Sequence, residues 1–161
     1  MSERALESSK ISLDAVDRRI LEALQRDGRM SNAELARTVG LSESACLRRT
    51  RLLEDSGIVA GVVLLVDQAR AGRPGNIFVE ITTDAQEDHA LAEFEAAVTA
   101  LPEVMECYLM SGEYDYLVRV IAADFGDYEQ IHGRLTRLPH VARIRSSFTL
   151  RTVTKKTAIP L

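Results

Sequence analysis

The sequence of 161 residues contains no tryptophan, only two cysteines and four prolines, and few aromatic residues of any kind. It has no apolar run near the roughly 20 residues that a membrane-spanning helix requires, so we predict no membrane partner. The first twelve residues are polar, which predicts a short disordered lead and no secretory signal. Cys46 and Cys107 fall in different predicted elements. A disulfide between them is therefore not expected, and reduced thiols in the cytoplasm are the simpler interpretation.

Sequence motifs of enzymes and metal sites are absent as well. There is no Walker loop, no dinucleotide-binding glycine fingerprint and no Gly-x-Ser-x-Gly elbow. The three histidines, His89, His132 and His140, are dispersed, and none has a second ligand at metal-binding spacing. We therefore predict no catalytic residue, no metal and no cofactor.

Basic residues are fewer than acidic ones, 20 against 24, so the formal net charge is −4. The charge is unevenly distributed. Between residues 11 and 60 eight arginines balance eight acidic residues, whereas from residue 76 onward eight basic residues meet thirteen acidic ones. Binding to nucleic acid would therefore depend on a local basic face, and we expect its affinity to come from a multivalent assembly.

The stretch from Ser31 to Gly57 has the pattern of two short helices joined by a tight turn. Ser31 and Glu34 form a capping box, in which each side chain accepts a hydrogen bond from a free backbone N–H at the helix start. Gly40 permits a sharp turn, and Ser42 is a second N-cap. This spacing is typical of a helix-turn-helix.

The second of these helices is predicted to have an apolar inner face and a basic outer face. Cys46, Thr50 and Leu53 recur at i, i+4 and i+7 and form the inner stripe. Arginine binds guanine edges and phosphates, so the outer face suits a DNA major groove, although a merely solvated helix face is the alternative. The predicted DNA-binding residues are Ser42, Ser44, Leu47, Arg48, Arg49 and Arg51.

Segments on either side complete a first domain. Asp14 is the N-cap of an earlier helix with Val16, Ile20 and Leu24 on its apolar face. The β-branched run over residues 58–66 predicts a strand or a small two-stranded wing. We assign residues 11–66 to a DNA-binding domain, 67–75 to a linker and 76–161 to a second domain.

The second domain has a different periodicity. Strands are predicted over 76–83, 104–110, 115–122 and 141–150, with helices over 88–101 and after Asp124. The order βαββαβ, in which both helices end in a similar Leu-Pro-x-Val phrase, predicts a ferredoxin-like fold with both helices on one face of an antiparallel sheet. The other face carries apolar side chains, so we expect a second copy to cover it. The predicted buried stripe of the second helix is Phe125, Tyr128, Ile131, Leu135 and Leu138.

These motifs resemble the Lrp/AsnC family, the leucine-responsive and asparagine-synthesis regulators. The resemblance covers nearly the whole chain and depends on LDAVDRRILEALQRDGRMSNAELARTVGLS, CLRRTRLLEDSGIVAG and PEVMECYLMSGEYDYLVRV. It implies an α+β fold, with an N-terminal winged helix-turn-helix followed by a C-terminal ferredoxin-like, ACT-like (RAM) domain. It also implies double-stranded DNA and an amino-acid effector, leucine or another small amino acid, as partners, and a homodimer that assembles to an octamer. The chain departs from the family's pattern at Glu43, Thr50, Leu52 and Val62.

The resemblance places the effector in the second domain, at contacts between dimers, near the loop between the second and third strands. A glycine loop offers backbone N–H groups to a carboxylate, and Asp115 or Glu113 can pair with an ammonium group. An ordinary hairpin turn with a solvated acid is the alternative. The predicted effector-binding residues are Ser111, Gly112, Glu113, Tyr114, Asp115, Tyr116, Thr136, Arg137, Leu138 and Ser146.

The two halves together predict a sequence-specific DNA-binding transcriptional regulator whose activity or assembly responds to an amino acid. The alternative is a stand-alone amino-acid-binding domain or small metabolic enzyme with a docking helical module. Because Asp115 is expected in a surface loop, Asp115→Ala should uncouple the effector from DNA binding without unfolding the protein.

Overall fold

The computed structural model describes residues 12–161, which divide into two compact units. A helical unit comprises the chain up to Leu65 together with Thr154–Leu161, and a sheet unit comprises Val66–Val153. The predicted disordered lead, residues 1–12, lies outside the described residues except for its last residue. The predicted start of the first domain at residue 11 also lies outside them. From residue 12 to the end, no helix has the length and apolar character needed to cross a bilayer.

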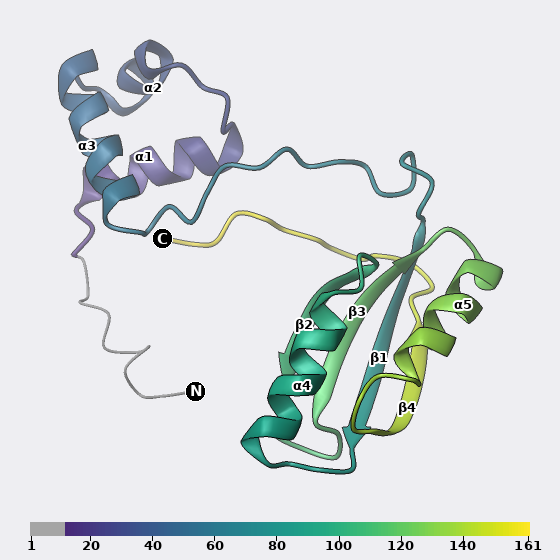
Figure 1. Cartoon of the computed structure of the whole chain (residues 1–161). Helices are drawn as coiled ribbons and strands as arrows, with labels where there is room; N and C mark the ends of the chain where they lie inside the picture. Colours follow the sequence, from purple (N-terminus) through teal and green to yellow (C-terminus); the bar gives the residue numbers. More distant parts are fainter. Residues whose placement is uncertain (1–11) are drawn as a thin grey trace. The chain divides into compact units, whose positions relative to one another are not determined.

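The helical unit is built from α1 (Ala15–Arg26), α2 (Asn32–Val39) and α3 (Glu43–Asp55), as Figure 1 shows. Asp14, Ser31 and Ser42 cap the three helices by accepting backbone N–H groups, which confirms the predicted caps. Gly40 ends α2 with a φ of 71°, a left-handed conformation that a residue without a Cβ adopts easily. The predicted helix-turn-helix is therefore confirmed.

Residues 58–66 form no strand, so the prediction of a strand or a two-stranded wing is wrong for the single chain. The side chains from Val62 to Val66 are 66–79% exposed. The sheet of the described chain contains only β1 to β4 and does not include this segment. A β-branched run becomes a strand only where a second strand satisfies its backbone groups, and within residues 12–161 none does.

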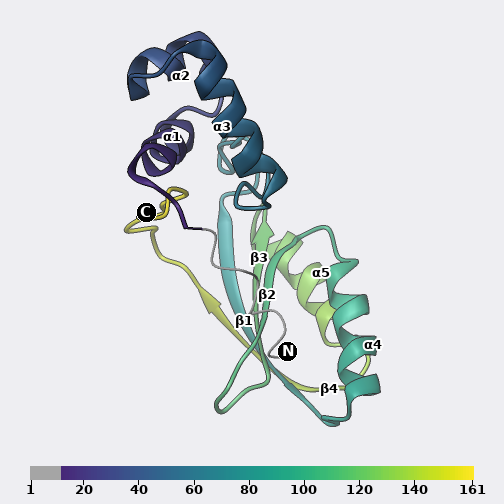
Figure 2. The same ribbon diagram turned by 90° about the vertical axis from the view of Figure 1, so that its left-hand side faces the viewer.

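The sheet unit has the predicted βαββαβ order. Its elements are β1 (Gly75–Thr83), α4 (Asp88–Thr99), β2 (Val104–Leu109), β3 (Tyr116–Ala122), α5 (Phe125–Leu135) and β4 (Val141–Phe148). The strands are antiparallel in the order β2-β3-β1-β4, which confirms the ferredoxin-like topology. Both helices cover the same face of the sheet, and the other face carries none (Figures 1 and 2).

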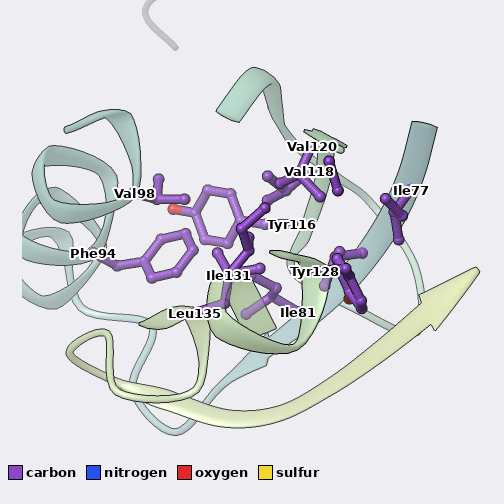
Figure 3. Packing of buried hydrophobic residues seen from close by; sticks show 12 residues of the cluster. Ile77, Ile81, Phe94, Val98, Tyr116, Val118, Val120, Tyr128, Ile131 and Leu135 are labelled. Carbon is purple, nitrogen blue, oxygen red and sulfur yellow. The ribbon is translucent and has the colours of Figure 1, made fainter. Parts of the chain in front are cut away.

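The core of this unit lies between the sheet and its two helices. Alternate residues of the central strands, such as Val79 on β1 and Val118 on β3, are fully buried beneath them. Figure 3 shows Phe94 of α4 facing Tyr116 of β3, with ring centroids 4.5 Å apart. The intervening residues of each strand therefore project from the uncovered face of the sheet.

Phe125 is an exception to the predicted apolar stripe of α5. Tyr128, Ile131 and Leu135 are buried as predicted, but Phe125 is 72% exposed. It is the first residue of α5, and its ring stacks on Phe148 of β4 at a centroid distance of 6.0 Å. The periodicity alone did not show that the helix starts beyond the edge of the core.

His140 joins three segments of the sheet unit. Its carbonyl oxygen accepts the Asp84 N–H at 2.9 Å. Its Nε2 lies 3.0 Å from Glu93 Oε2 on α4, and its Nδ1 lies 3.5 Å from Asp84 Oδ1 after β1. The hydrogen bond to Glu93, followed by the negative charges of Glu93 and Asp84, raises the pKa of His140 above its usual 6.5.

We expect this histidine to make the protein less stable as the pH rises above about 6.5. A raised folded-state pKa means that the added stability is complete below the unfolded pKa and is lost as the pH passes through the folded pKa. Denaturant unfolding over this range, compared between the wild type and His140→Asn, measures the effect. Asparagine tolerates the positive φ of 62° at this position. Identical pH dependence in the two proteins would contradict the prediction.

Candidate nucleic-acid interface and effector pocket

The outer face of α3 is exposed, as the sequence predicted. Ser44, Leu47, Arg48 and Arg51 are all exposed on α3, and Ser42, also exposed, caps it. The inner stripe is confirmed, because Cys46 and Leu53 are at most 4% exposed and the Thr50 Oγ1 donates to the Cys46 carbonyl oxygen at 3.0 Å. Asn32 Nδ2 also donates to the Glu43 carbonyl oxygen at 3.0 Å, which fixes α2 against the start of α3.

Arg49 differs from the other predicted DNA-binding residues because it is already paired. Its Nη1 lies 2.7 Å from Asp17 Oδ1 and 2.7 Å from Asp14 Oδ2. These two hydrogen bonds raise the pKa of Arg49, the bond to Asp17 most, and its side chain is only 28% exposed. The structure therefore gives Arg49 a role in fastening α3 to α1, which differs from the DNA contact predicted for it.

A pocket of about 390 Å³ opens on the uncovered face of the sheet unit. Its lining residues are Glu80, Thr82, Glu113, Tyr114, Arg143, Ile144 and Arg145. Glu80 pairs in register with Arg145, and Thr82 with Arg143, so these side chains leave β1 and β4 on the same side. Two guanidinium groups and two carboxylates thus surround one concavity. Such an arrangement can bind a small zwitterion, which carries one charge of each sign.

Only two of the ten predicted effector-binding residues, Glu113 and Tyr114, line this pocket. Ser111 and Gly112 are exposed in the same loop between β2 and β3. Thr136, Arg137 and Leu138 lie at the end of α5, where Thr136 is the C-cap. The structure does not bring this second group to the pocket.

Two further predicted residues have roles inside the fold. Tyr116 is 1% exposed, and its hydroxyl donates to Glu95 Oε1 at 2.8 Å, so its side chain belongs to the core shown in Figure 3. Burial, followed by the bond to Glu95, raises the pKa of Tyr116. Ser146 pairs in register with the buried Val79 and accepts a hydrogen bond from the Tyr128 hydroxyl on the helix side of the sheet.

Asp115 organises the loop instead of standing free in it. Its Oδ2 accepts hydrogen bonds from the Thr83 backbone N–H at 2.7 Å and from the Thr83 hydroxyl at 2.9 Å. Its Oδ1 accepts a third from Gln86 Nε2 at 3.0 Å. The carboxylate therefore ties the β2–β3 loop to the end of β1.

Sequence reasoning missed the strand residues of the pocket, which are Glu80, Thr82, Arg143, Ile144 and Arg145. A signal was present, because polar residues alternate on β1 and arginines alternate on β4. The register that sets them opposite each other could not be read from the alternation.

Among residues 12–161, no group of histidine, cysteine and acidic side chains could hold a metal ion.

The described chain combines a helix-turn-helix that has an exposed basic helix with a ferredoxin-like unit that has a charged pocket. This combination defines a class of DNA-binding proteins that carry a separate ligand-binding domain. Two family profiles match the chain, the AsnC-type helix-turn-helix domain over residues 13–54 and the Lrp/AsnC ligand binding domain over residues 76–159. The chain belongs to the Lrp/AsnC family.

Similar proteins cover nearly the whole chain. The Bkd operon transcriptional regulator of Pseudomonas aeruginosa is 39% identical over 150 residues, spanning 92% of this chain and 98% of that protein. The leucine-responsive regulatory protein of Escherichia coli is 41% identical over 135 residues, spanning 83% and 82% of the two chains. Among solved structures, an AsnC family transcriptional regulator from Agrobacterium tumefaciens is similar with a TM-score of 0.89 and 34% identity, covering 92% of this chain and 97% of that one.

A second solved relative, a transcriptional regulator from Neisseria meningitidis, was determined as a complex with L-Met. It has a TM-score of 0.88 and 34% identity and covers 92% of this chain and 97% of its own.

Family membership makes the present chain a DNA-binding transcriptional regulator. The alternative of a small metabolic enzyme with a docking module is therefore set aside.

Proposed function

We propose that α3 enters the major groove of double-stranded DNA and reads sequence there, and that an amino acid bound in the sheet unit adjusts this activity. The observation that carries the first part is the exposed row of Ser44, Leu47, Arg48 and Arg51 on a helix whose start Ser42 caps. In a helix-turn-helix, the N-terminal residues of the second helix contact base edges. The exposed acids Glu54 and Asp55 at the far end of α3 would be repelled by phosphates, which favours entry by the N-terminal half.

Each exposed residue fits a particular DNA group. Arg48 and Arg51 can form paired hydrogen bonds with a guanine edge or with phosphates. Leu47, which is 39% exposed, suits the methyl group of thymine. Ser42 and Ser44, whose hydroxyl oxygens lie 3.3 Å apart, can donate to phosphate oxygens at the start of the helix.

The pocket on the uncovered sheet face suits a free amino acid. Arg143 can pair with its carboxylate, and Glu113 with its ammonium group. Tyr114 lies beside them and offers an apolar ring to the side chain of the ligand. The L-Met complex of the Neisseria meningitidis relative supports an amino acid as the effector, so methionine and leucine head the ligands to test.

We further propose that the protein acts in the cytoplasm as a dimer that can assemble to an octamer. Both cysteines are free thiols. The uncovered sheet face carries Phe78 and Tyr108, which are 37% and 51% exposed, and a second copy would cover them. A dimer would present two α3 helices to successive major grooves about one helical turn apart.

Arg143→Ala is expected to weaken amino-acid binding by on the order of ten-fold or more, because the carboxylate loses a charge-assisted hydrogen bond. A thermal-shift screen of amino acids selects the ligand, and calorimetry then gives its affinity for each variant. Arg137→Ala is the matched control, since Arg137 is exposed but lies at the end of α5 and away from the pocket. Loss of binding in Arg137→Ala with none in Arg143→Ala would reject the pocket and favour the site predicted at the end of α5.

A further inference from the structure

Residues Thr154–Leu161, here called the tail, are docked on the helical unit although they follow the last strand in sequence. The side-chain amide of Gln25 on α1 pairs with the backbone of Ile159 in both directions. Its Nε2 donates to the Ile159 carbonyl oxygen at 3.2 Å, and its Oε1 accepts the Ile159 N–H at 2.7 Å. Leu161 packs against the apolar core of the same unit. These contacts hold the tail at its far end.

The tail changes the charge of the unit on which it docks. Residues 12–65 contain eight arginines and eight acidic residues, which cancel. Val66–Val153 contains eight arginines and fourteen acidic residues, a net charge of −6. The tail contains Lys155 and Lys156 and no acidic residue. The docked tail therefore gives an otherwise neutral DNA-binding unit a charge of +2.

Both lysines are free to meet a ligand. They are exposed, and within residues 12–161 no hydrogen bond or ion pair engages either ammonium group. Arg49, by contrast, is neutralised by Asp14 and Asp17. Because the tail is anchored at Ile159 and Leu161, the side chains of Lys155 and Lys156 remain at high local concentration beside the helix-turn-helix.

We propose that the tail is a second DNA-binding element, in which Lys155 and Lys156 contact DNA phosphates. This inference depends on the DNA binding proposed for the helical unit, but it does not depend on which residues of α3 read the bases. Neutralising a phosphate releases bound counterions, so each lysine adds affinity that decreases as salt rises. The contact carries no sequence information and acts on any duplex.

The test is the double variant Lys155→Gln, Lys156→Gln in the full chain, titrated by fluorescence anisotropy with a duplex of about 30 base pairs of random sequence at several salt concentrations. We expect affinity on the order of ten-fold lower near physiological salt. The slope of log affinity against log salt should become shallower by about 0.9 for each lysine lost. The matched control is Arg151→Gln, which removes a positive charge just before the tail, in a residue of the sheet unit, and should change both quantities far less.

A second variant tests the docking. Gln25→Ala with Leu161→Ser removes the anchors but keeps both lysines and the charge of the tail, and we expect it to lose part of the affinity that the double-lysine variant loses. Wild-type affinity and salt slope in the double-lysine variant, or an equal loss in Arg151→Gln, would overturn the inference.

Arg48→Ala, measured alongside, separates the DNA contact proposed for the tail from the one proposed for α3. Loss of sequence-specific binding only in Arg48→Ala would reject the tail and keep α3, whereas loss of affinity only in the double-lysine variant would reject the role of α3 and keep the tail.

Discussion

Arg48→Ala is expected to weaken specific DNA binding by on the order of 10- to 100-fold, corresponding to the roughly 1–3 kcal/mol of one bidentate contact to a base. Arg48 is exposed on the outer face of α3, and within residues 12–161 no ion pair engages it. Its loss should therefore leave the melting temperature unchanged. Anisotropy titrations with a duplex that the wild-type protein selects from a random pool measure the affinity, and circular dichroism measures the melting temperature.

Arg49→Ala is the natural comparison, because the two arginines are neighbours in sequence with opposite environments. Removing Arg49 leaves Asp14 and Asp17 facing each other without their shared cation, so we expect a lower melting temperature of the helical unit. Its direct effect on DNA affinity should be smaller than that of Arg48→Ala. A stable Arg49→Ala protein that has lost DNA binding, beside an Arg48→Ala protein that has kept it, would contradict the assignment.

Asp115→Ala is expected to destabilise the sheet unit by about 2–3 kcal/mol, because a charged acceptor of three hydrogen bonds is lost. The Thr83 N–H, at the buried end of β1, would be left without the oxygen that it now contacts at 2.7 Å. This expectation replaces the one from sequence, in which the substitution affected only effector coupling. Urea unfolding gives the change in free energy.

Glu113→Ala provides the control, since Glu113 is exposed two residues earlier in the same loop. Its effect on stability should remain within about 0.5 kcal/mol, the usual range for a surface substitution. If Asp115→Ala has wild-type stability and yet loses amino-acid binding, then Asp115 is a direct ligand and its hydrogen bonds to Thr83 contribute little.

The features that the sequence predicted well are local in the chain. Ser31 and Glu34, three residues apart, determine the start of α2, and Gly40 determines its end, so their interactions can be read from spacing alone. The inner face of α3 and the alternating burial of β1 follow from periodicities of 3.6 and 2 residues. The order of elements then restricts the sheet to very few topologies.

The features that the sequence did not predict depend on distant partners. Arg49 meets Asp14 and Asp17, which lie 35 and 32 residues earlier, and Gln25 meets Ile159 across 134 residues. The pocket depends on the register between β1 and β4, which no local signal specifies. For residues 58–66 the sequence correctly indicated β propensity, but a strand also needs a neighbour.

In the proposed function, α3 contacts DNA and the sheet pocket contacts an amino acid. Hydroxyl-radical footprinting of the full chain, read by mass spectrometry, tests both parts in one measurement through Leu47 on α3 and Tyr114 in the pocket. We predict that a selected duplex protects Leu47 and leaves Tyr114 reactive, whereas the amino acid found by thermal shift protects Tyr114. Full reactivity of Leu47 in the DNA complex, with protection confined to Val66–Val153, would contradict the account.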